Sequence, residues 1–304
     1  MTTAYKVFNK TNILFALFLI LEFCLPSVPK ACGTHTVIFI GILQVIFWVR
    51  VFFLKDARKA IVFGDIVFLV LLFLFAWELA TAKFSALDRF LYPTPGEVIK
   101  LFITEIPDLI SAFLSSITIL MSGYLLGVVV GVFLGLIVGW NKRLYEVAQP
   151  ITKMLAAIPP IVYIPYAIAI FPTFRLSSIF VIFIGSFWPI FTNTLSGVLD
   201  IDRKLIDSAR ALNVSNRNML LHVILPGTIP SIISGATIGL LFSFILLTSA
   251  EMIGATNGMG WYVKYFSDFA NYPKVIVGIV FMGIVVSCIK FFFEKLEKYL
   301  LRWR

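Results

Sequence analysis

Long apolar stretches alternate with short polar ones along the whole chain. Each apolar stretch is close to the roughly 20 residues that an α-helix needs to cross the hydrocarbon core of a bilayer. We therefore predict an all-α, polytopic membrane helix bundle of about eight transmembrane helices. The predicted spans are approximately 12–28, 36–54, 60–82, 110–140, 151–172, 176–199, 232–252 and 274–292. The first is the weakest, because Glu22 and Pro26 interrupt it.

The positively charged residues are distributed unevenly between alternate loops. Loops rich in Lys and Arg remain on the cytoplasmic side of a membrane. If both termini are inside, most of the 25 Lys and Arg residues fall in cytoplasmic segments. Among them are Arg50, Lys55, Arg58 and Lys59, between the second and third spans. We therefore predict a multi-pass protein of a bacterial cytoplasmic (inner) membrane, with both termini in the cytoplasm.

One polar segment on the predicted outer side, 83–109, is long enough to contain a helix of its own. Thr94 is placed to cap this helix, with Pro95 in the first turn and Glu97 three residues after the cap. Apolar residues then recur on one face. We predict a helix that lies at the membrane interface.

A second polar segment, 200–231, lies on the predicted cytoplasmic side. Its apolar residues recur at helical spacing in two short groups. We expect two short helices, the second ending near Leu225 and Pro226, because proline has no backbone N–H to continue a helix. A cytoplasmic loop of two helices suggests a binding site for a partner.

The span 110–140 has a glycine at every fourth position over five repeats. These are Gly123, Gly127, Gly131, Gly135 and Gly139. A face of glycines allows the backbone of a neighbouring helix to approach closely. We interpret the stripe as a helix-packing surface, with the lining of a permeation path as the alternative. Either interpretation predicts a compact bundle.

Four prolines interrupt the span 151–172, and two of them, Pro159 and Pro160, are adjacent. Each removes one backbone hydrogen-bond donor, so we predict a broken or kinked helix. Breaks in membrane helices accompany either a simple packing kink or a transport path. Both interpretations remain open.

The composition narrows the class of protein. Of the 304 residues, 60% are hydrophobic and 13% charged, which is too apolar for a soluble domain. The net charge is +9, but the basic residues stand at the ends of apolar stretches. We therefore predict that the chain contacts membrane lipids and binds no nucleic acid. Cys24, Cys32 and Cys288 lack metal-ligand spacing. We expect unpaired thiols and no metal site, although Cys24 and Cys32 are close enough in sequence to pair.

The segment 200–231 contains a recognisable motif. Its first part is Asp207-Ser208-Ala209-Arg210-Ala211-Leu212-Asn213, and ten residues later comes Ile224-Leu225-Pro226. This pattern resembles the cytoplasmic loop motif of ABC importer permeases. That motif reads Glu-Ala-Ala, three residues, Gly, about nine residues, Ile, any residue, Leu-Pro.

Three positions depart from the motif. Asp207 stands at the acidic position, Ser208 replaces an alanine, and Asn213 replaces the glycine. The glycine ends the first short helix in a left-handed conformation. Asn tolerates that conformation best after glycine, so we expect the turn to be kept.

The resemblance extends from about Trp77 to the C-terminus and favours the nitrate, sulfonate and taurine branch of these permeases. Further matching phrases are Trp77-Glu78, Pro93-Thr94-Pro95-Gly96-Glu97-Val98, Ile158-Pro159-Pro160 with Ile164-Pro165, and Ala250-Glu251-Met252-Ile253-Gly254-Ala255 with Gly258-Met259-Gly260. Residues 1–59 lie outside the usual six-helix core. We therefore expect an N-terminal transmembrane hairpin extension at 1–59 and the ABC importer permease transmembrane domain at 60–304.

The resemblance implies a non-catalytic permease subunit of an ATP-driven, binding-protein-dependent importer. Its partners would be a second copy of the permease, two cytoplasmic ABC ATPase subunits and an extracytoplasmic solute-binding protein. The sequence has no Gly-x-x-x-x-Gly-Lys-Ser/Thr loop, so ATP and Mg²⁺ are expected in the ATPase and no cofactor in this chain.

The same resemblance assigns the coupling to the ATPase to the loop 200–231. We expect the small Ala209 to face a groove of the ATPase. The residues that would form the joint are Asp207, Ser208, Ala209, Arg210, Asn213, Ile224, Leu225 and Pro226.

Polar residues within spans are the candidates for the translocation path, because charge at membrane depth is costly. Glu251 and Glu78 stand near the outer ends of their helices, where they either face the path or reach the headgroups. Hydroxyl and amide side chains either line the path or bond to carbonyls of their own helix. The candidates are Glu251, Glu78, Pro159, Pro160, Asn193, Thr194 and Ser243.

Two other classes of function fit the sequence less well. A secondary transporter would need acids facing the bundle interior and internal repeats, and an intramembrane enzyme would need a nucleophile with a base or a metal cluster. Few acids stand in the middle of a span. For the substrate, the branch favours nitrate, sulfonates, taurine or a related small anion. Aromatic acids and vitamin precursors remain alternatives.

Overall fold

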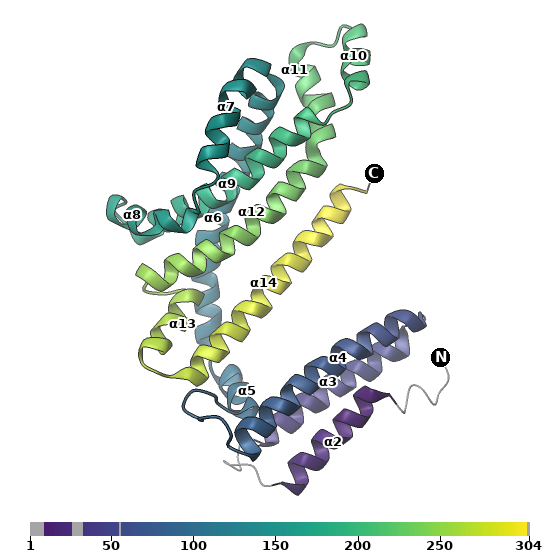
Figure 1. The fold of residues 1–304 in the computed structure, drawn as a ribbon, viewed down its shortest axis with the longest axis vertical. Coiled ribbons are helices and arrows are strands. Elements are labelled where there is room, and N and C mark those ends of the chain that lie inside the picture. Colours follow the sequence, from purple (N-terminus) through teal and green to yellow (C-terminus); the bar gives the residue numbers. More distant parts are fainter. Residues whose placement is uncertain (1–8, 26–32, 55, 303–304) are drawn as a thin grey trace. The chain divides into compact units, whose positions relative to one another are not determined.

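The computed structural model describes residues 9–25, 33–54 and 56–302. Every regular element among them is a helix, which confirms the predicted all-α class for the described residues (Figure 1). The chain divides into two compact units. The first comprises Met1–Asp108 and Tyr265–Val280, and the second comprises Leu109–Lys264 and Phe281–Arg304.

Three helices form the body of the first unit: α2 (Lys10–Cys24), α3 (Gly33–Phe53) and α4 (Ala57–Glu78). Their common core is apolar. It contains Leu14, Phe18, Ile40, Phe47, Val51, Val67, Leu71 and Leu74. The expected boundary between an N-terminal hairpin and the rest of the chain at residue 59 stays a prediction. In the structure, α4 shares its core with α2 and α3.

Two ion pairs align α2 with α4. Lys10 Nζ lies 2.9 Å from Asp65 Oδ1, and Lys83 Nζ lies 3.1 Å from Glu22 Oε2. Lys10, at the start of α2, pairs with Asp65 in the first part of α4. Glu22, near the end of α2, pairs with Lys83, which follows the end of α4. The two helices are therefore parallel, as an up-down-up arrangement of α2, α3 and α4 requires.

The helix α5 (Pro95–Thr104) begins as its sequence predicts. The Thr94 hydroxyl accepts a hydrogen bond from Glu97 N at 3.3 Å, and Pro95 occupies the first turn. This cap satisfies one of the backbone donors that the first turn of a helix leaves unpaired. A bond of 2.9 Å from Trp77 Nε1 to the Pro93 carbonyl fixes the preceding loop to the end of α4.

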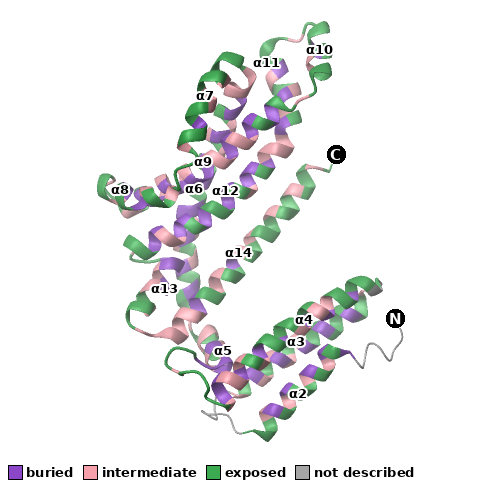
Figure 2. Ribbon diagram, in the orientation of Figure 1, coloured by how far each residue is buried: buried purple, intermediate pink, exposed green. Residues whose placement is uncertain are grey.

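The second unit is built around α6 (Ile106–Trp140), α9 (Phe174–Leu199) and α12 (Leu225–Gly254). The later part of α14 (Tyr272–Leu300) packs against them. Figure 2 shows buried positions along α6, α9 and α12, whereas α7 (Lys142–Leu155) is largely exposed. The Tyr124 hydroxyl, on α6, donates to the Ala236 carbonyl of α12 at 3.0 Å, so α6 contacts α12 as well as α9.

The predicted break in the proline-rich segment is confirmed. The helix α7 ends at Leu155, a short 3₁₀ turn η2 (Pro160–Val162) follows, and α8 (Tyr163–Ile170) continues. The two helical pieces meet at 68°. Pro159 and Pro160 fall in the break because neither can donate the backbone bond that would continue α7.

The expected end of the second loop helix near Leu225 and Pro226 is wrong. The short helix α11 (Asn216–Met219) passes through a π-helical turn, η3 (Leu220–Ile224), directly into α12. In η3 the Leu225 N–H bonds to the Leu220 carbonyl, five residues back. This wider turn precedes the proline and allows the helix to continue past a residue that donates no bond.

The count of eight spans is not confirmed. In the described part of the chain, 6 helices are long and apolar enough to cross a membrane, or up to 7 if the bent pair α7 and α8 forms one span. The helix α2 has 15 residues, or about 22 Å at the rise of an α-helix, compared with about 30 Å for the hydrocarbon core. The end of the first predicted span, 26–28, lies outside the described residues.

Candidate functional site

The loop 200–231 begins with α10 (Arg203–Ala211), which is capped at both ends. Asp202 Oδ1 accepts a bond from Lys204 N at 2.9 Å at the start of the helix. At the other end, Asn213 has φ 54°, in the left-handed region. The predicted left-handed turn at Asn213 is therefore confirmed.

Two backbone hydrogen bonds define this turn as a Schellman motif. Val214 N donates to the Ala209 carbonyl at 3.2 Å, and Asn213 N donates to the Arg210 carbonyl at 2.9 Å. They satisfy carbonyls that the last turn of α10 would otherwise leave unpaired. The chain thus reverses from α10 into α11 at a defined angle.

Both short helices of the loop rest on the ends of longer ones. A buried cluster joins Ala209 of α10 with Met219 and Ile224 of the second helix. It also contains Leu136 of α6 and Val198 of α9. A displacement of α10 would therefore be transmitted to α6, α9 and α12 through side-chain contacts that are already close-packed.

The expectation that Ala209 faces a partner is wrong. Only 9% of Ala209 is exposed, and it packs within the chain's own cluster. The outward face of α10 instead presents Leu205, 59% exposed, and extends to Leu212, 79% exposed, just past the end of the helix. Asp207, Ser208 and Arg210 are also exposed on this segment. Sequence reasoning selected the loop but assigned its outward side to the wrong residue.

The glycine stripe of α6 packs against α9, as predicted. A Cβ at Gly123 would lie 2.7 Å from the Ile179 carbonyl oxygen, and one at Gly139 would lie 2.8 Å from Val198 Cβ. The remaining glycines of the stripe meet Ser186, Ile190 and Thr194 of α9. The two backbones are therefore closer than any larger residue would allow.

The polar candidates of α9 and α12 lie at helix contacts. Asn193 Nδ2 donates to the Pro189 carbonyl of its own helix at 2.8 Å. Ser243 Oγ donates to the Gly239 carbonyl at 2.8 Å, again within one helix. Thr194 is buried against Gly135. The hydrogen bonds of Asn193 and Ser243 therefore favour the interpretation in which these side chains bond to carbonyls of their own helix.

Glu251 is the centre of a buried hydrogen-bonded knot, and only 1% of it is exposed. Its Oε1 accepts a bond from Ser116 Oγ of α6 at 2.6 Å, and its Oε2 accepts one from Gly260 N at 2.7 Å. Ser116 Oγ also accepts a bond from Met259 N at 2.9 Å. Three segments, α6, α12 and the start of α13 (Met259–Asp268), are thereby tied together.

The glycines beside this knot leave room for the carboxylate. Gly258 has φ 138°, and a Cβ there would lie 2.5 Å from Glu251 Cδ. A Cβ at Gly260 would lie 2.6 Å from the Thr248 carbonyl oxygen. The sequence signal for these contacts is the phrase Gly258-Met259-Gly260 after Glu251. Sequence reasoning used this phrase only for the family resemblance and did not identify Ser116 as the partner.

Glu78 and Glu251 are held in different units. Glu78 is buried in the first unit, where its Oε2 accepts a bond from Thr36 Oγ1 of α3 at 3.4 Å. Pro159 is exposed at the break after α7. A role in the path stays a prediction for Glu78, Glu251, Pro159 and Pro160.

The described residues contain no group of three or more His, Cys, Asp or Glu side chains that could hold a metal ion. Cys24 and Cys288 are exposed free thiols in the described part of the chain. Cys32 lies outside the described residues, so its pairing with Cys24 is untested.

The chain is similar in sequence to known transport proteins. The model of a family described as "Binding-protein-dependent transport system inner membrane component" matches residues 127–302. A Bacillus subtilis protein named as the putative aliphatic sulfonates transport permease SsuC is 32% identical over 60% of this chain and 66% of its own length. The nitrate import permease NrtB of Leptolyngbya laminosa is 32% identical over 54% of this chain and 58% of its own.

The chain thus spans less than two thirds of the length of these two relatives. A solved chain of the MetNI methionine ABC transporter, in an inward-facing conformation, has a similar fold with a TM-score of 0.57. It is 20% identical, and the match covers 65% of this chain and 98% of the solved one.

Proposed function

Because the chain belongs to the family of binding-protein-dependent transport system inner membrane components, we propose that it forms the translocation path for a small anion in an ABC importer. The chain is the permease component of such an importer. Nitrate and organosulfonates are the favoured substrates, because proteins named for their import are 32% identical to it. The permease itself performs no chemistry in this proposal.

The observation that carries the coupling mechanism is the exposed apolar face of α10. Leu205 and Leu212 are 59% and 79% exposed, whereas the neighbouring flank of the helix, with Ala209 and Ile206, packs into the chain's own cluster. Exposed leucines at the end of a membrane protein's cytoplasmic loop mark a surface that a partner covers. We assign this surface to an ABC ATPase subunit, which binds ATP and Mg²⁺.

A continuous helix connects this surface to the Glu251 knot. The segment Asn216–Gly254 is one helix of 39 residues, or about 58 Å at the rise of an α-helix. Its first turn follows the Schellman turn of α10, and Glu251 stands in its last turn. A movement of α10 on the ATPase would therefore displace α13 and the far end of α6 through this helix.

The remaining partners follow from the same family. We propose a second copy of the permease, two ATPase subunits and an extracytoplasmic solute-binding protein. The protein would lie in the inner membrane with both termini and the loop 200–231 in the cytoplasm. The support for this orientation is the excess of Lys and Arg in the segments that it places inside.

The test is to place a charge on the exposed face of α10. In Leu212→Glu, an unpaired carboxylate would enter the apolar contact with the ATPase, costing on the order of 2–5 kcal/mol of association free energy. We expect loss of ATPase co-purification and of nitrate or sulfonate uptake, with unchanged membrane yield of the permease. Leu144→Glu on α7, where Leu144 is 43% exposed, is the matched control. Full uptake and ATPase association by Leu212→Glu would refute the coupling mechanism.

A further inference from the structure

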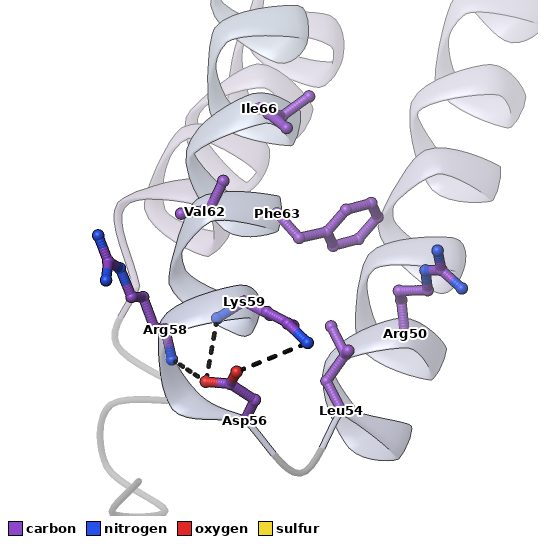
Figure 3. Close-up of a pocket in the computed structure, with 8 residues that line it drawn as sticks. All are labelled: Arg50, Leu54, Asp56, Arg58, Lys59, Val62, Phe63 and Ile66. Carbon is purple, nitrogen blue, oxygen red and sulfur yellow. Dashed lines mark hydrogen bonds and ion pairs between the residues drawn. The ribbon is translucent and has the colours of Figure 1, made fainter. Parts of the chain in front are cut away.

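A cavity of about 590 Å³ opens where α3 ends and α4 begins (Figure 3). It belongs entirely to the first unit and is separate from the loop 200–231. Its volume is within the range of about 300–1,000 Å³ that is usual for small-ligand sites. The lining residues are Arg50, Leu54, Asp56, Arg58, Lys59, Val62, Phe63 and Ile66.

Positive charge predominates around this cavity. Arg50, Arg58 and Lys59 line it together with a single acid, Asp56. The Asp56 carboxylate caps α4 by accepting bonds from Arg58 N at 2.9 Å and Lys59 N at 3.5 Å. Its second oxygen is 3.8 Å from Lys59 Nζ, which is a loose ion pair. In the described part of the chain, Arg50 and Arg58 have no acidic side chain within ion-pair distance.

The cations approach the cavity from both helices. Figure 3 shows the Lys59 side chain extending from α4 towards α3, where Leu54 and Arg50 lie. Arg58 points to the other side of α4, and the Arg50 guanidinium is turned away from α4. The Arg50 guanidinium carbon is 5.9 Å from the centroid of the Phe63 ring, at the outer limit of a cation–π contact. Arg50 and Lys59 thus line the cavity from the two facing helices, and a rotation of the long Arg50 side chain towards α4 would bring both cations to one anion.

The lining changes from charged to apolar along α4. Val62 and Ile66 follow Lys59 by one and two turns, and they are 52% and 54% exposed. The distance along the axis from Lys59 to Ile66 is about 10 Å. This part of α4 belongs to the candidate membrane span Arg58–Lys83. The cavity therefore matches a ligand with an anionic head and an apolar tail.

We propose that this cavity binds an anionic phospholipid of the cytoplasmic leaflet, with its phosphate between Arg50 and Lys59 and an acyl chain along Val62 and Ile66. The proposal depends on the proposed orientation, which places the α3–α4 turn in the cytoplasm. Basic residues at that membrane surface attract anionic headgroups. A free phosphate would use the cations but not the exposed apolar residues, so the lining favours a lipid.

The experiment measures lipid binding by the full-length permease in a neutral detergent. Native mass spectrometry would count bound dioctanoyl phosphatidylglycerol and dioctanoyl phosphatidylcholine. We expect Arg50→Gln/Lys59→Gln to weaken phosphatidylglycerol binding about tenfold or more, since each cation near the surface contributes to headgroup attraction. Binding of phosphatidylcholine should not change. A second variant, Val62→Gln, leaves the charge of the cavity unchanged. It should nevertheless weaken the binding of phosphatidylglycerol and shorten the time for which the lipid stays bound.

The matched control is Lys142→Gln/Arg143→Gln. These two residues follow Asn141, which caps the start of α7, just as Arg58 and Lys59 follow the cap of α4 closely. The control removes the same charge and should bind phosphatidylglycerol as the wild type does. Equal losses in the two double variants would overturn the proposal and indicate unspecific charge attraction.

Competition by soluble anions distinguishes the source of the phosphate. Neither inorganic phosphate nor glycerol 3-phosphate at millimolar concentration should displace phosphatidylglycerol. Displacement by either, together with no effect of Val62→Gln, would overturn the lipid proposal in favour of a phosphate site. ATPase association and uptake test the coupling mechanism by different readouts, so failure of one proposal would not be mistaken for failure of the other.

Discussion

At the scale of single residues, Glu251 illustrates how one carboxylate can organise several segments. Its two oxygens accept bonds from Ser116 and Gly260, so both face protein donors. The Gly260 N–H belongs to the first turn of α13, where the helix dipole favours a carboxylate. Glu251 therefore stabilises the contact of α12 with α6 and α13.

The same knot predicts the effect of adding one methyl group at Gly258. In Gly258→Ala, the new Cβ would overlap the Glu251 carboxyl group, and φ 138° is strained for any L-residue. We expect a loss of about 1–3 kcal/mol of stability, seen as a lower melting temperature of the purified permease. Gly283→Ala is the control, because a Cβ at Gly283 meets nothing within 4 Å. Equal melting temperatures for the two variants would contradict the close contact between Gly258 and the Glu251 carboxyl group.

At the scale of secondary-structure elements, the left-handed end of α10 determines how the chain enters the 39-residue helix. Asn213 provides this conformation without glycine, because its short polar side chain tolerates positive φ. The turn then places Val214 against the buried cluster that contains Ala209. The geometry of the loop is therefore set locally, by residues next to one another in the sequence.

Asn213→Pro should disrupt this turn. Proline fixes φ near −65°, whereas Asn213 has φ 54°, and proline also lacks the N–H that bonds to the Arg210 carbonyl. We expect a cost on the order of 2–3 kcal/mol to the loop and reduced ATPase co-purification. Asn213→Gly should retain both the turn and the association. If the Asn213→Pro variant still binds the ATPase as the wild type does, the turn is dispensable for coupling.

Local signals explain what the sequence could predict at this scale. The Thr94 cap, the proline break after α7, the Asn213 turn and the glycine stripe each depend on residues within one or a few helical turns. The orientation of Ala209 depends on Leu136 and Met219, which come from other helices. The bond from Ser116 to Glu251 joins residues 135 positions apart. Such contacts are determined by tertiary packing, which local patterns do not encode.

At the scale of the whole molecule, the two units are stabilised differently. The second unit relies on small residues, because glycines of α6 and α12 allow α9 to lie close to both helices. The first unit relies on bulky apolar residues together with a buried ion pair. Deleting residues 1–54 would therefore uncover the apolar side of α4 and remove the Glu22 partner of Lys83. We expect such a deletion to reduce membrane yield even if the transport core needs no hairpin.

Substitution of the buried pair tests the first unit without deleting it. The side chains of Lys83 and Glu22 are only 1% and 3% exposed. Glu22→Leu would remove the paired carboxylate from the buried ammonium, which keeps its bond to the Leu25 carbonyl, and should cost about 3–5 kcal/mol. The double variant Glu22→Leu/Lys83→Leu should recover part of this loss, because the buried Glu78 also interacts with both side chains. Thermal unfolding of the purified full-length chain measures both.

The exposed pair of the same unit is the control for this cycle. The side chains of Lys10 and Asp65 are 54% and 47% exposed, so Lys10→Leu/Asp65→Leu should change stability by no more than about 1 kcal/mol.

ATPase co-purification should be unchanged in each folded variant, because the coupling surface on α10 belongs to the second unit. A double variant as unstable as Glu22→Leu would show that Glu22 stabilises the bundle through contacts other than its ion pair. Loss of ATPase association by a folded variant would instead show that the first unit takes part in coupling.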